Sequence, residues 1–269
     1  MESGHLSPPL QRAAPAGITA VMAPDGHTSR RHTSGARFAA TQWSVVLAAG
    51  DRDDRTAAGR ALDALVRAYW FPLYAFVRRQ GNSPQQAEDL TQGFFAHLLE
   101  KNALATVDGT RGKFRSFLLT ALKHFITDEY RKTTARKRGG TRRGFSLETL
   151  DAEGRYDRAL ADTMTPEKVF ERNWAIAVLN TVVELLEQEY VDRGRGEIFA
   201  ALRHCLDGQA DRRSYADLAE RLGMTEAALR VTVHRMRKRY RELLREEILQ
   251  TVADPELVDE ELRHLAQCL

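Results

Sequence analysis

Residues 214–237 of the chain read SYADLAERLGMTEAALRVTVHRMR, and this stretch predicts two short helices joined by a sharp turn. Ser214 and Asp217 predict a capping box at the start of the first helix. Gly223 suits the turn because glycine tolerates the left-handed backbone conformation, and Thr225 can cap the helix that follows. This order of features is typical of a helix-turn-helix, whose second helix enters the major groove of DNA.

The second helix of this unit is predicted to have one apolar face and one basic face. Its apolar positions step by three and four residues and therefore share one buried side: Leu229, Val233, Met236 and Tyr240. The side chains left pointing outward on its first turns are Glu226, Arg230, Val231, His234 and Arg235. A plain helical hairpin with a solvated basic face would share this charge pattern. The turn glycine, the cap and the small Ala219, which allows two helices to pack closely, favour DNA binding.

The formal net charge of +3 hides strong charges on separate segments. Residues 109–143 carry about +9 and residues 212–245 about +6, whereas residues 144–171 carry about −4 and residues 246–269 about −6. Two basic segments of this size are candidates for contacts with nucleic-acid phosphates. Aromatic side chains interleaved in the first segment could stack on unpaired bases, although their helical spacing also fits a core.

The composition excludes several classes of protein. With 43% hydrophobic and 8% aromatic residues the chain can build a core, so disorder throughout is excluded. Its two cysteines, Cys205 and Cys268, form neither a CxxC motif nor a metal-spaced cluster, which excludes a disulfide scaffold and predicts no metal site. No apolar run approaches the roughly 18 residues of a membrane span, so we expect a cytoplasmic protein without membrane contacts.

Periodic apolar positions predict helices and no strands, hence an all-α fold of two small helical domains joined by a flexible linker. A polar, acidic stretch separates two helical blocks, which is typical of a domain boundary. The predicted segments are a disordered tail at 1–40, a first domain at 41–138, a linker at 139–165, a second domain at 166–250 and an acidic tail at 251–269.

Prolines and capping residues predict where several helices start, and where one of them bends or divides. Pro72 lies inside the helix expected near residues 60–79 and should kink it or split it in two. Residues 83–86 predict a capping box with a proline at the first helical position, and the helix they open should expose Glu88, Asp89 and Gln92. Residues 165–168 predict a second threonine cap followed by proline.

Two parts of the chain resemble a known family. Residues 61–138 resemble region two of bacterial sigma factors of the sigma-70 family, extracytoplasmic-function (ECF) subgroup. The matching stretches are LYAFVRR (73–79), AEDLTQGFF (87–95), FLL (117–119) and DEYRK (128–132). Residues 166–249, which contain the helix-turn-helix, resemble region four of the same family. Both parts occur in the family's order with a linker between them.

The resemblance implies a promoter-specificity subunit of RNA polymerase that has no cofactor and is not an enzyme. It implies core RNA polymerase and promoter DNA as partners and allows an anti-sigma factor as a third. Glu88, Asp89 and Gln92 would dock on the clamp helices of the polymerase. The minus-ten element would be read and melted by Arg111, Lys113, Lys123, His124, Asp128, Tyr130, Arg131 and Lys132. The minus-thirty-five element would be read by Arg230, Val231, His234, Arg235 and Lys238.

Two residues depart from the family pattern. Gly93 stands where the family usually has an acidic residue in the polymerase-binding helix, and Val231 occupies a position that is often small and polar. A glycine inside a helix costs about 1 kcal/mol of helix propensity. Because Val231 has no polar group for base contacts, base recognition would rest more on Arg230 and Arg235.

Two other classes of function were weighed against this one. A one-component helix-turn-helix repressor or activator would bind palindromic duplex DNA without polymerase. An enzyme lacks support, because Gly139-Gly140-Thr141 has no preceding strand for a phosphate loop and the eight histidines form no HxxxH motif. We expect no catalytic residues.

The acidic tail allows two interpretations. Leu257, Leu262 and Leu265 predict a short amphipathic helix that packs on the domain. Alternatively, the negative charge of the tail could cover the basic recognition helix when DNA is absent.

Overall fold

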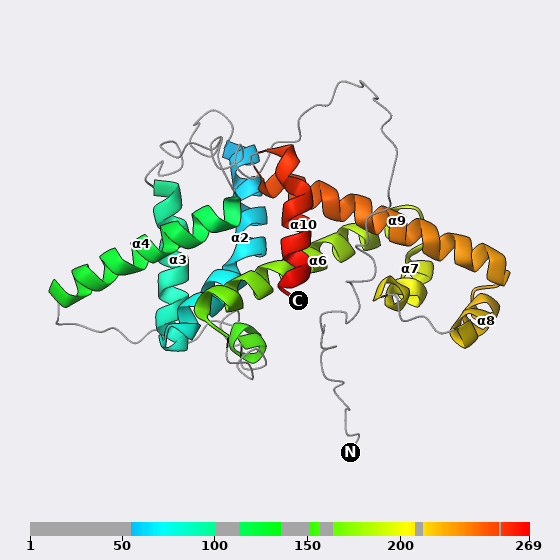
Figure 1. The fold of residues 1–269 in the computed structure, drawn as a ribbon, viewed down its shortest axis with the longest axis horizontal. Helices are drawn as coiled ribbons and strands as arrows, with labels where there is room; N and C mark the ends of the chain where they lie inside the picture. The colour runs from blue at the N-terminus through cyan, green and yellow to red at the C-terminus, as the bar shows by residue number, and fades with distance from the viewer. Residues whose placement is uncertain (1–54, 101–112, 136–150, 157–163, 208–211, 253) are drawn as a thin grey trace, which may run out of the picture.

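The computed structural model describes residues 55–100, 113–135, 151–156, 164–207, 212–252 and 254–269 (Figure 1). The α-helices are α2 (Arg55–Arg79), α3 (Pro84–Glu100), α4 (Phe114–Ala135), α6 (Pro166–Asp192), α7 (Gly196–Leu202), α8 (Arg212–Arg221), α9 (Glu226–Thr251) and α10 (Val258–Gln267). Short 3-10 helices span Arg203–Asp207 and Pro255–Leu257, and residues 151–156 add one more short helix. Apart from an isolated bridge between Lys113 and Val252, the described residues contain no β-structure, which confirms the all-α prediction there.

The predicted helix starts at Ser83 and Thr165 are confirmed. The Ser83 hydroxyl accepts from the Gln86 backbone N–H at 3.3 Å, and the Gln86 side chain accepts from the Ser83 N–H at 3.0 Å. The Thr165 hydroxyl accepts from the Lys168 N–H at 3.3 Å, with proline at the next position. These caps satisfy N–H groups that have no partner inside the helix, so α3 and α6 begin where the sequence predicts.

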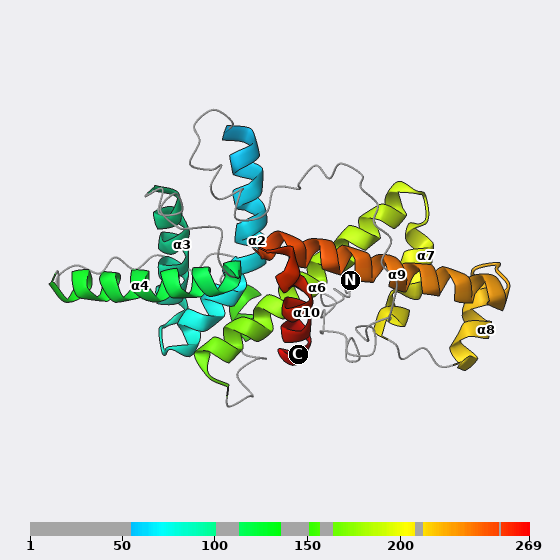
Figure 2. The same cartoon turned by 45° about the horizontal axis from the view of Figure 1, so that its top comes forward.

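Pro72 lies inside α2, which continues as a single helix through it. The alternative of two separate helices is therefore wrong, and Figure 2 shows that the axis of α2 bends along its length. Proline removes one backbone N–H donor and crowds the preceding turn, which is the usual cause of such a bend.

The core of the molecule runs between helices of the two sequence blocks. Helix α6 of the second block packs along α2 of the first, and the fully buried Trp174 of α6 lies in one continuous core with Tyr69 of α2. The Tyr69 ring meets Phe114 edge-on, with centroids 5.5 Å apart. The guanidinium carbon of Arg115 sits 4.9 Å from the centroid of the Trp174 ring. Two separate domains are therefore not confirmed.

Part of the predicted linker also packs on the first block. In the helix of residues 151–156, Glu153 accepts hydrogen bonds from the Tyr74 hydroxyl at 2.5 Å and from Arg78 Nε at 2.6 Å. Burial would raise the pKa of Glu153, but these hydrogen bonds outweigh it and the pKa is lowered. Tyr156 is buried, with Arg78 over its ring at 5.0 Å. This piece of the linker is docked, while residues 139–150 and 157–163 lie outside the described residues.

The acidic segment at the end of the chain forms helix α10, which packs against α6 and the later turns of α9 (Figures 1 and 2). Val258 and Leu265 bury their side chains there. The predicted amphipathic helix is thus present. Because Arg245 of α9 pairs with Asp259 of α10, the acidic helix meets α9 about ten residues, or about 15 Å, beyond Arg235. Helix α10 therefore does not cover the outward face of the first turns of α9.

Candidate functional site

Helices α8 and α9 are joined by the sharp glycine turn that the sequence predicts. Gly223 in the turn has φ +63°, the left-handed conformation that favours glycine. The Thr225 hydroxyl caps α9 by accepting from the Ala228 N–H at 3.2 Å. The four apolar residues expected on the inner face of α9 are all buried: Leu229, Val233, Met236 and Tyr240. Helix α8 already begins at Arg212, so Ser214 lies inside it and the predicted capping box at Ser214 is wrong.

The side chains predicted to contact DNA on α9 all point to the surface: Arg230, Val231, His234, Arg235 and Lys238. The predicted outward residue Glu226 does so as well. Arg230 is held by Glu226 one turn earlier, at 3.2 Å, and lies 5.6 Å from the centroid of the Tyr215 ring of α8. Arg235 and His234 follow on the next turn. The exposed face therefore offers an arginine that is already oriented, beside further cationic and imidazole groups.

Other basic residues of the 212–245 segment hold the fold together. Arg237 donates through Nε and Nη2 to the backbone carbonyl of Cys205, at 2.9 and 2.6 Å. Arg239 pairs with Glu189 of α6 at 2.8 Å and with Glu246 at 3.1 Å. A count of charges along the sequence does not separate these structural arginines from the exposed ones.

A second predicted DNA-contact surface lies on the C-terminal half of α4, which extends past α3 (Figures 1 and 2). The predicted contact residues His124, Asp128, Tyr130, Arg131 and Lys132 are exposed there. Tyr130 exposes 48% of its surface, while its hydroxyl donates to the side-chain oxygen of Asn82 in the turn between α2 and α3. This hydrogen bond ties the projecting helix to the turn between α2 and α3, while the Tyr130 side chain stays partly exposed to solvent. An exposed aromatic ring beside Arg131 and Lys132 can stack on a base while the cations contact phosphates.

Two other predicted minus-ten residues have partners inside the protein. Lys113 pairs with Glu260 at 2.9 Å and with Glu261 at 3.1 Å, both on α10. Lys123 pairs with Glu167 of α6 at 2.8 Å, and this hydrogen bond lowers the pKa of Glu167. The structure therefore separates Lys113, at the start of α4, from the exposed residues at its other end. Arg111 lies outside the described residues.

The polar triad predicted on α3 is only partly exposed. Asp89 and Gln92 face solvent, whereas Glu88 is 8% exposed and accepts from the Gln92 amide at 3.0 Å. The expectation that Glu88 lies on an exposed face is wrong. Within this triad, Asp89 and Gln92 are the side chains available to a partner.

Gly93 on the same helix has a packing role. A Cβ atom built there would lie 3.3 Å from Cζ of Phe125 on α4. Phe125 also contacts the rings of Phe94 and His97, with centroids 5.9 and 5.2 Å away. A side chain at this position would press on the Phe125 ring, so the glycine lets α3 and α4 approach closely.

The two predicted DNA-contact surfaces, on α9 and on the C-terminal half of α4, lie at opposite ends of the molecule. Figures 1 and 2 both place the projecting end of α4 at one end of the long axis, and α8 with the start of α9 at the other. Helices α2, α6 and α10 lie between them. This arrangement can present two separate surfaces to one extended nucleic acid.

A family model for sigma-70 region 2 matches residues 65–136, which cover most of α2, all of α3 and all of α4. This match supports a sigma factor of the sigma-70 family with a role in transcription initiation. Members of that family are transcription factors rather than enzymes, and a sigma-70 region 2 implies binding to core RNA polymerase and promoter DNA. No curated protein and no solved structure matches the chain. Within the described residues, no helix combines the length and the apolar character needed to cross a lipid bilayer.

Proposed function

We propose that this protein is a sigma factor of the ECF subgroup, which binds core RNA polymerase in the cytoplasm and directs it to promoters. The observation that carries the proposal is the presence, in one chain, of a sigma-70 region 2 match at residues 65–136 and of two helices joined by a tight turn at residues 212–251, the second of them capped and with an exposed basic face. Together they correspond to two promoter-reading parts of one specificity subunit.

In this proposal each surface has its own task. Asp89 and Gln92 on α3 dock on the clamp helices of the polymerase. The exposed end of α4 contacts the minus-ten region, where Tyr130 stacks on an unpaired base and Arg131 and Lys132 contact phosphates. Opening of a duplex needs both kinds of contact, because the bases that leave the stack must find a new partner.

The exposed face of α9 reads the minus-thirty-five duplex. Arg230 and Arg235 project from the first turns of a recognition helix, the position from which such helices contact base edges. Because the two surfaces lie at opposite ends of the molecule, each can contact its own promoter element (Figures 1 and 2).

The test is transcription from promoter DNA with purified core RNA polymerase. Genomic fragments are transcribed with core enzyme alone, with this protein alone and with both together. We expect run-off transcripts from discrete start sites only when both are present. A one-component regulator would instead protect a palindromic duplex by itself and leave core enzyme unable to start at specific sites, and that result would reject the proposal.

A further inference from the structure

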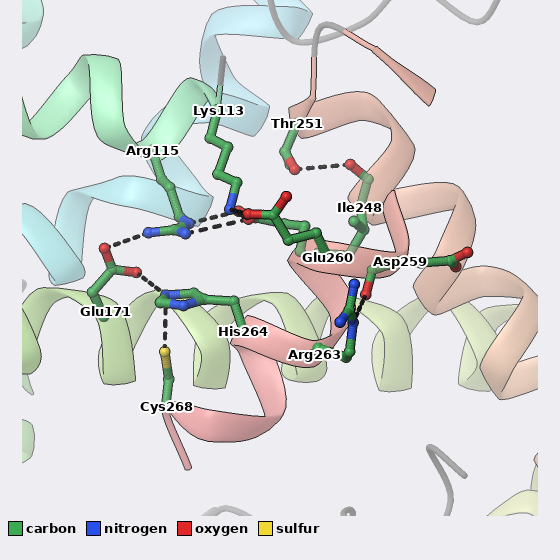
Figure 3. A network of polar contacts seen from close by, with 11 residues as sticks. Lys113, Arg115, Glu171, Ile248, Thr251, Asp259, Glu260, Arg263, His264 and Cys268 are labelled. Carbon is green, nitrogen blue, oxygen red and sulfur yellow. Dashed lines mark hydrogen bonds and ion pairs between the residues drawn. The ribbon is translucent and has the colours of Figure 1, made fainter. Parts of the chain in front are cut away.

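Three side chains with metal-binding chemistry meet where α10 packs on α6: Glu171, His264 and Cys268 (Figure 3). His264 Nε2 lies 3.0 Å from a carboxylate oxygen of Glu171 and 3.3 Å from Sγ of Cys268. One ligand atom from each residue lies within 4.8 Å of the other two. All three side chains are partly buried, so the cluster is ordered by packing and can still be reached from solvent.

The spacing of these residues fits a site shared by two helices. Cys268 is the C-cap residue of α10 and keeps a helical backbone conformation, so it lies one turn from His264 on the same face. Glu171 comes from α6, so the ligand set crosses the contact between the two helices. A carboxylate oxygen, an imidazole nitrogen and a thiolate sulfur are the donors that zinc binds in proteins.

The surrounding residues orient the carboxylate. Arg115 donates from Nη1 to one oxygen of Glu171, while the other oxygen faces His264. A ligand carboxylate that is hydrogen-bonded on its second oxygen is typical of protein metal sites, because the outer contact fixes its orientation. Figure 3 shows Arg115, Glu171, His264 and Cys268 in a continuous row.

The charges of the network also leave room for a cation. Two cationic side chains, Lys113 and Arg115, face three carboxylates, on Glu171, Glu260 and Glu261. Without a metal these five groups carry one excess negative charge. A divalent ion would neutralise the negative charges of its ligands Glu171 and the Cys268 thiolate. Lys113 and Arg115 would then neutralise Glu260 and Glu261.

We propose that Glu171, His264 and Cys268 bind a zinc ion that fastens α10 to α6. Three protein ligands leave a fourth position for water or another small ligand. As the metal–sulfur bond forms, the thiol proton leaves to solvent. The bound ion stabilises the docked position of α10, because the ligand set exists only when α10 lies against α6. The inference does not depend on a role in transcription.

The test uses the purified full chain after treatment with a chelator, titrated with Co²⁺ as a coloured substitute for zinc. We expect a thiolate-to-cobalt charge-transfer absorption that saturates at one ion per chain and is displaced by Zn²⁺. Cys268→Ser should abolish the band. His264→Gln and Glu171→Gln should weaken Co²⁺ binding at least about 10- to 100-fold. Zn²⁺ should also raise the Tm of the wild-type chain and leave that of Cys268→Ser unchanged.

Cys205→Ala is the matched control, because Cys205 is the other cysteine of the chain and also lies beside a histidine, His204, at 3.5 Å. It should retain the band and the affinity. Circular dichroism of each variant checks that its helices are present, and His264→Gln gives a second test should Cys268→Ser fail to fold. The proposal is overturned by a wild-type chain without the band, by a band that survives Cys268→Ser or is lost in Cys205→Ala, or by unchanged affinity in His264→Gln.

Discussion

Arg115 at the start of α4 and Glu261 on α10 form a buried ion pair between residues that are 146 positions apart, with Nε 2.5 Å from the carboxylate oxygen Oε1. The side chain of Glu261 is fully buried. Arg115 also pairs with Glu171 of α6, so one guanidinium joins three helices. The end of the chain is thereby fixed to the first helical block.

This relationship predicts a large loss of stability when one partner is removed. Arg115→Met should lower the free energy of unfolding by about 3 kcal/mol, because it leaves the Glu261 carboxylate buried with Lys113 as its remaining cation. Urea unfolding followed by circular dichroism measures the change. Lys132→Met, which breaks an exposed pair with Glu129, should cost less than about 1 kcal/mol. Equal losses in the two variants would contradict a special role for the buried pair.

Asp89→Arg should weaken binding to core RNA polymerase. Reversing an exposed charge in a docking surface places like charges together, and the dissociation constant should rise at least about tenfold. Surface plasmon resonance with immobilised core enzyme measures it. The control is Glu197→Arg, a charge reversal at an exposed position of α7, which should leave binding unchanged. If Asp89→Arg binds as the wild type does, α3 is not the polymerase contact.

The two predicted DNA-contact surfaces, on α9 and on the C-terminal half of α4, should differ in their dependence on DNA sequence. Arg230→Ala and Arg235→Ala should relax sequence preference at upstream base pairs, with about 1–3 kcal/mol lost at each contacted pair where the contact is bidentate. Arg131→Ala and Lys132→Ala should instead weaken binding to all sequences. Each should reduce the slope of the logarithm of the binding constant against the logarithm of the salt concentration by about one. Competition binding of holoenzyme to promoter libraries at several salt concentrations separates the two effects. Sequence-independent losses from both pairs would argue against base recognition by α9.

Truncation after Leu249 should destabilise the protein without raising its affinity for DNA. The cut removes the buried side chains of Val252, Val258 and Leu265, and burial of each such side chain contributes roughly 1.5–3 kcal/mol. The Tm should therefore fall. Because α10 meets α9 well beyond Arg235, promoter affinity at low salt should stay the same. A truncated chain that binds promoter DNA more tightly would restore the interpretation that the acidic segment blocks the recognition helix.

Glu189 should make folding sensitive to acid. The hydrogen bond from Arg239 lowers the pKa of Glu189 below its ordinary value of 4.5. A depressed folded pKa means that the ionised carboxylate contributes stability above the unfolded pKa, and that this contribution is lost as the pH falls through the folded pKa. Glu189→Gln should be less stable than wild type at neutral pH, and the gap should shrink below pH 4.5. Urea unfolding across this range, with Glu220→Gln as the control, checks the trend.

The sequence by itself determined many of the helices and the glycine turn between α8 and α9. Thr225, Gly223 and the buried series from Leu229 to Tyr240 act within a few residues of one another, so their spacing carries the information. The same holds for the caps at Ser83 and Thr165. The sequence places the start of α8 at Ser214, whereas the helix begins at Arg212. The spacing of Ser214 and Asp217 does not distinguish a capping box from two positions inside a helix.

Only the tertiary structure decided which polar residues are available to a partner. Glu88 has the same chemistry as Asp89 and lies next to it, yet packing buries one and exposes the other. Lys113 and Lys123 look like DNA contacts in the sequence and are paired with carboxylates of α10 and α6.

The cluster of Glu171, His264 and Cys268 shows the same division. The spacing of His264 and Cys268, four residues apart on an amphipathic helix, is a local signal that a search for paired histidines overlooks. Glu171 lies 93 residues before His264, and the sequence offers no spacing that connects them. The periodicity of a helix defines which of its side chains share a face. The packing of the whole core decides which other helix that face meets. Here core packing brings α6, α10 and the start of α4 together.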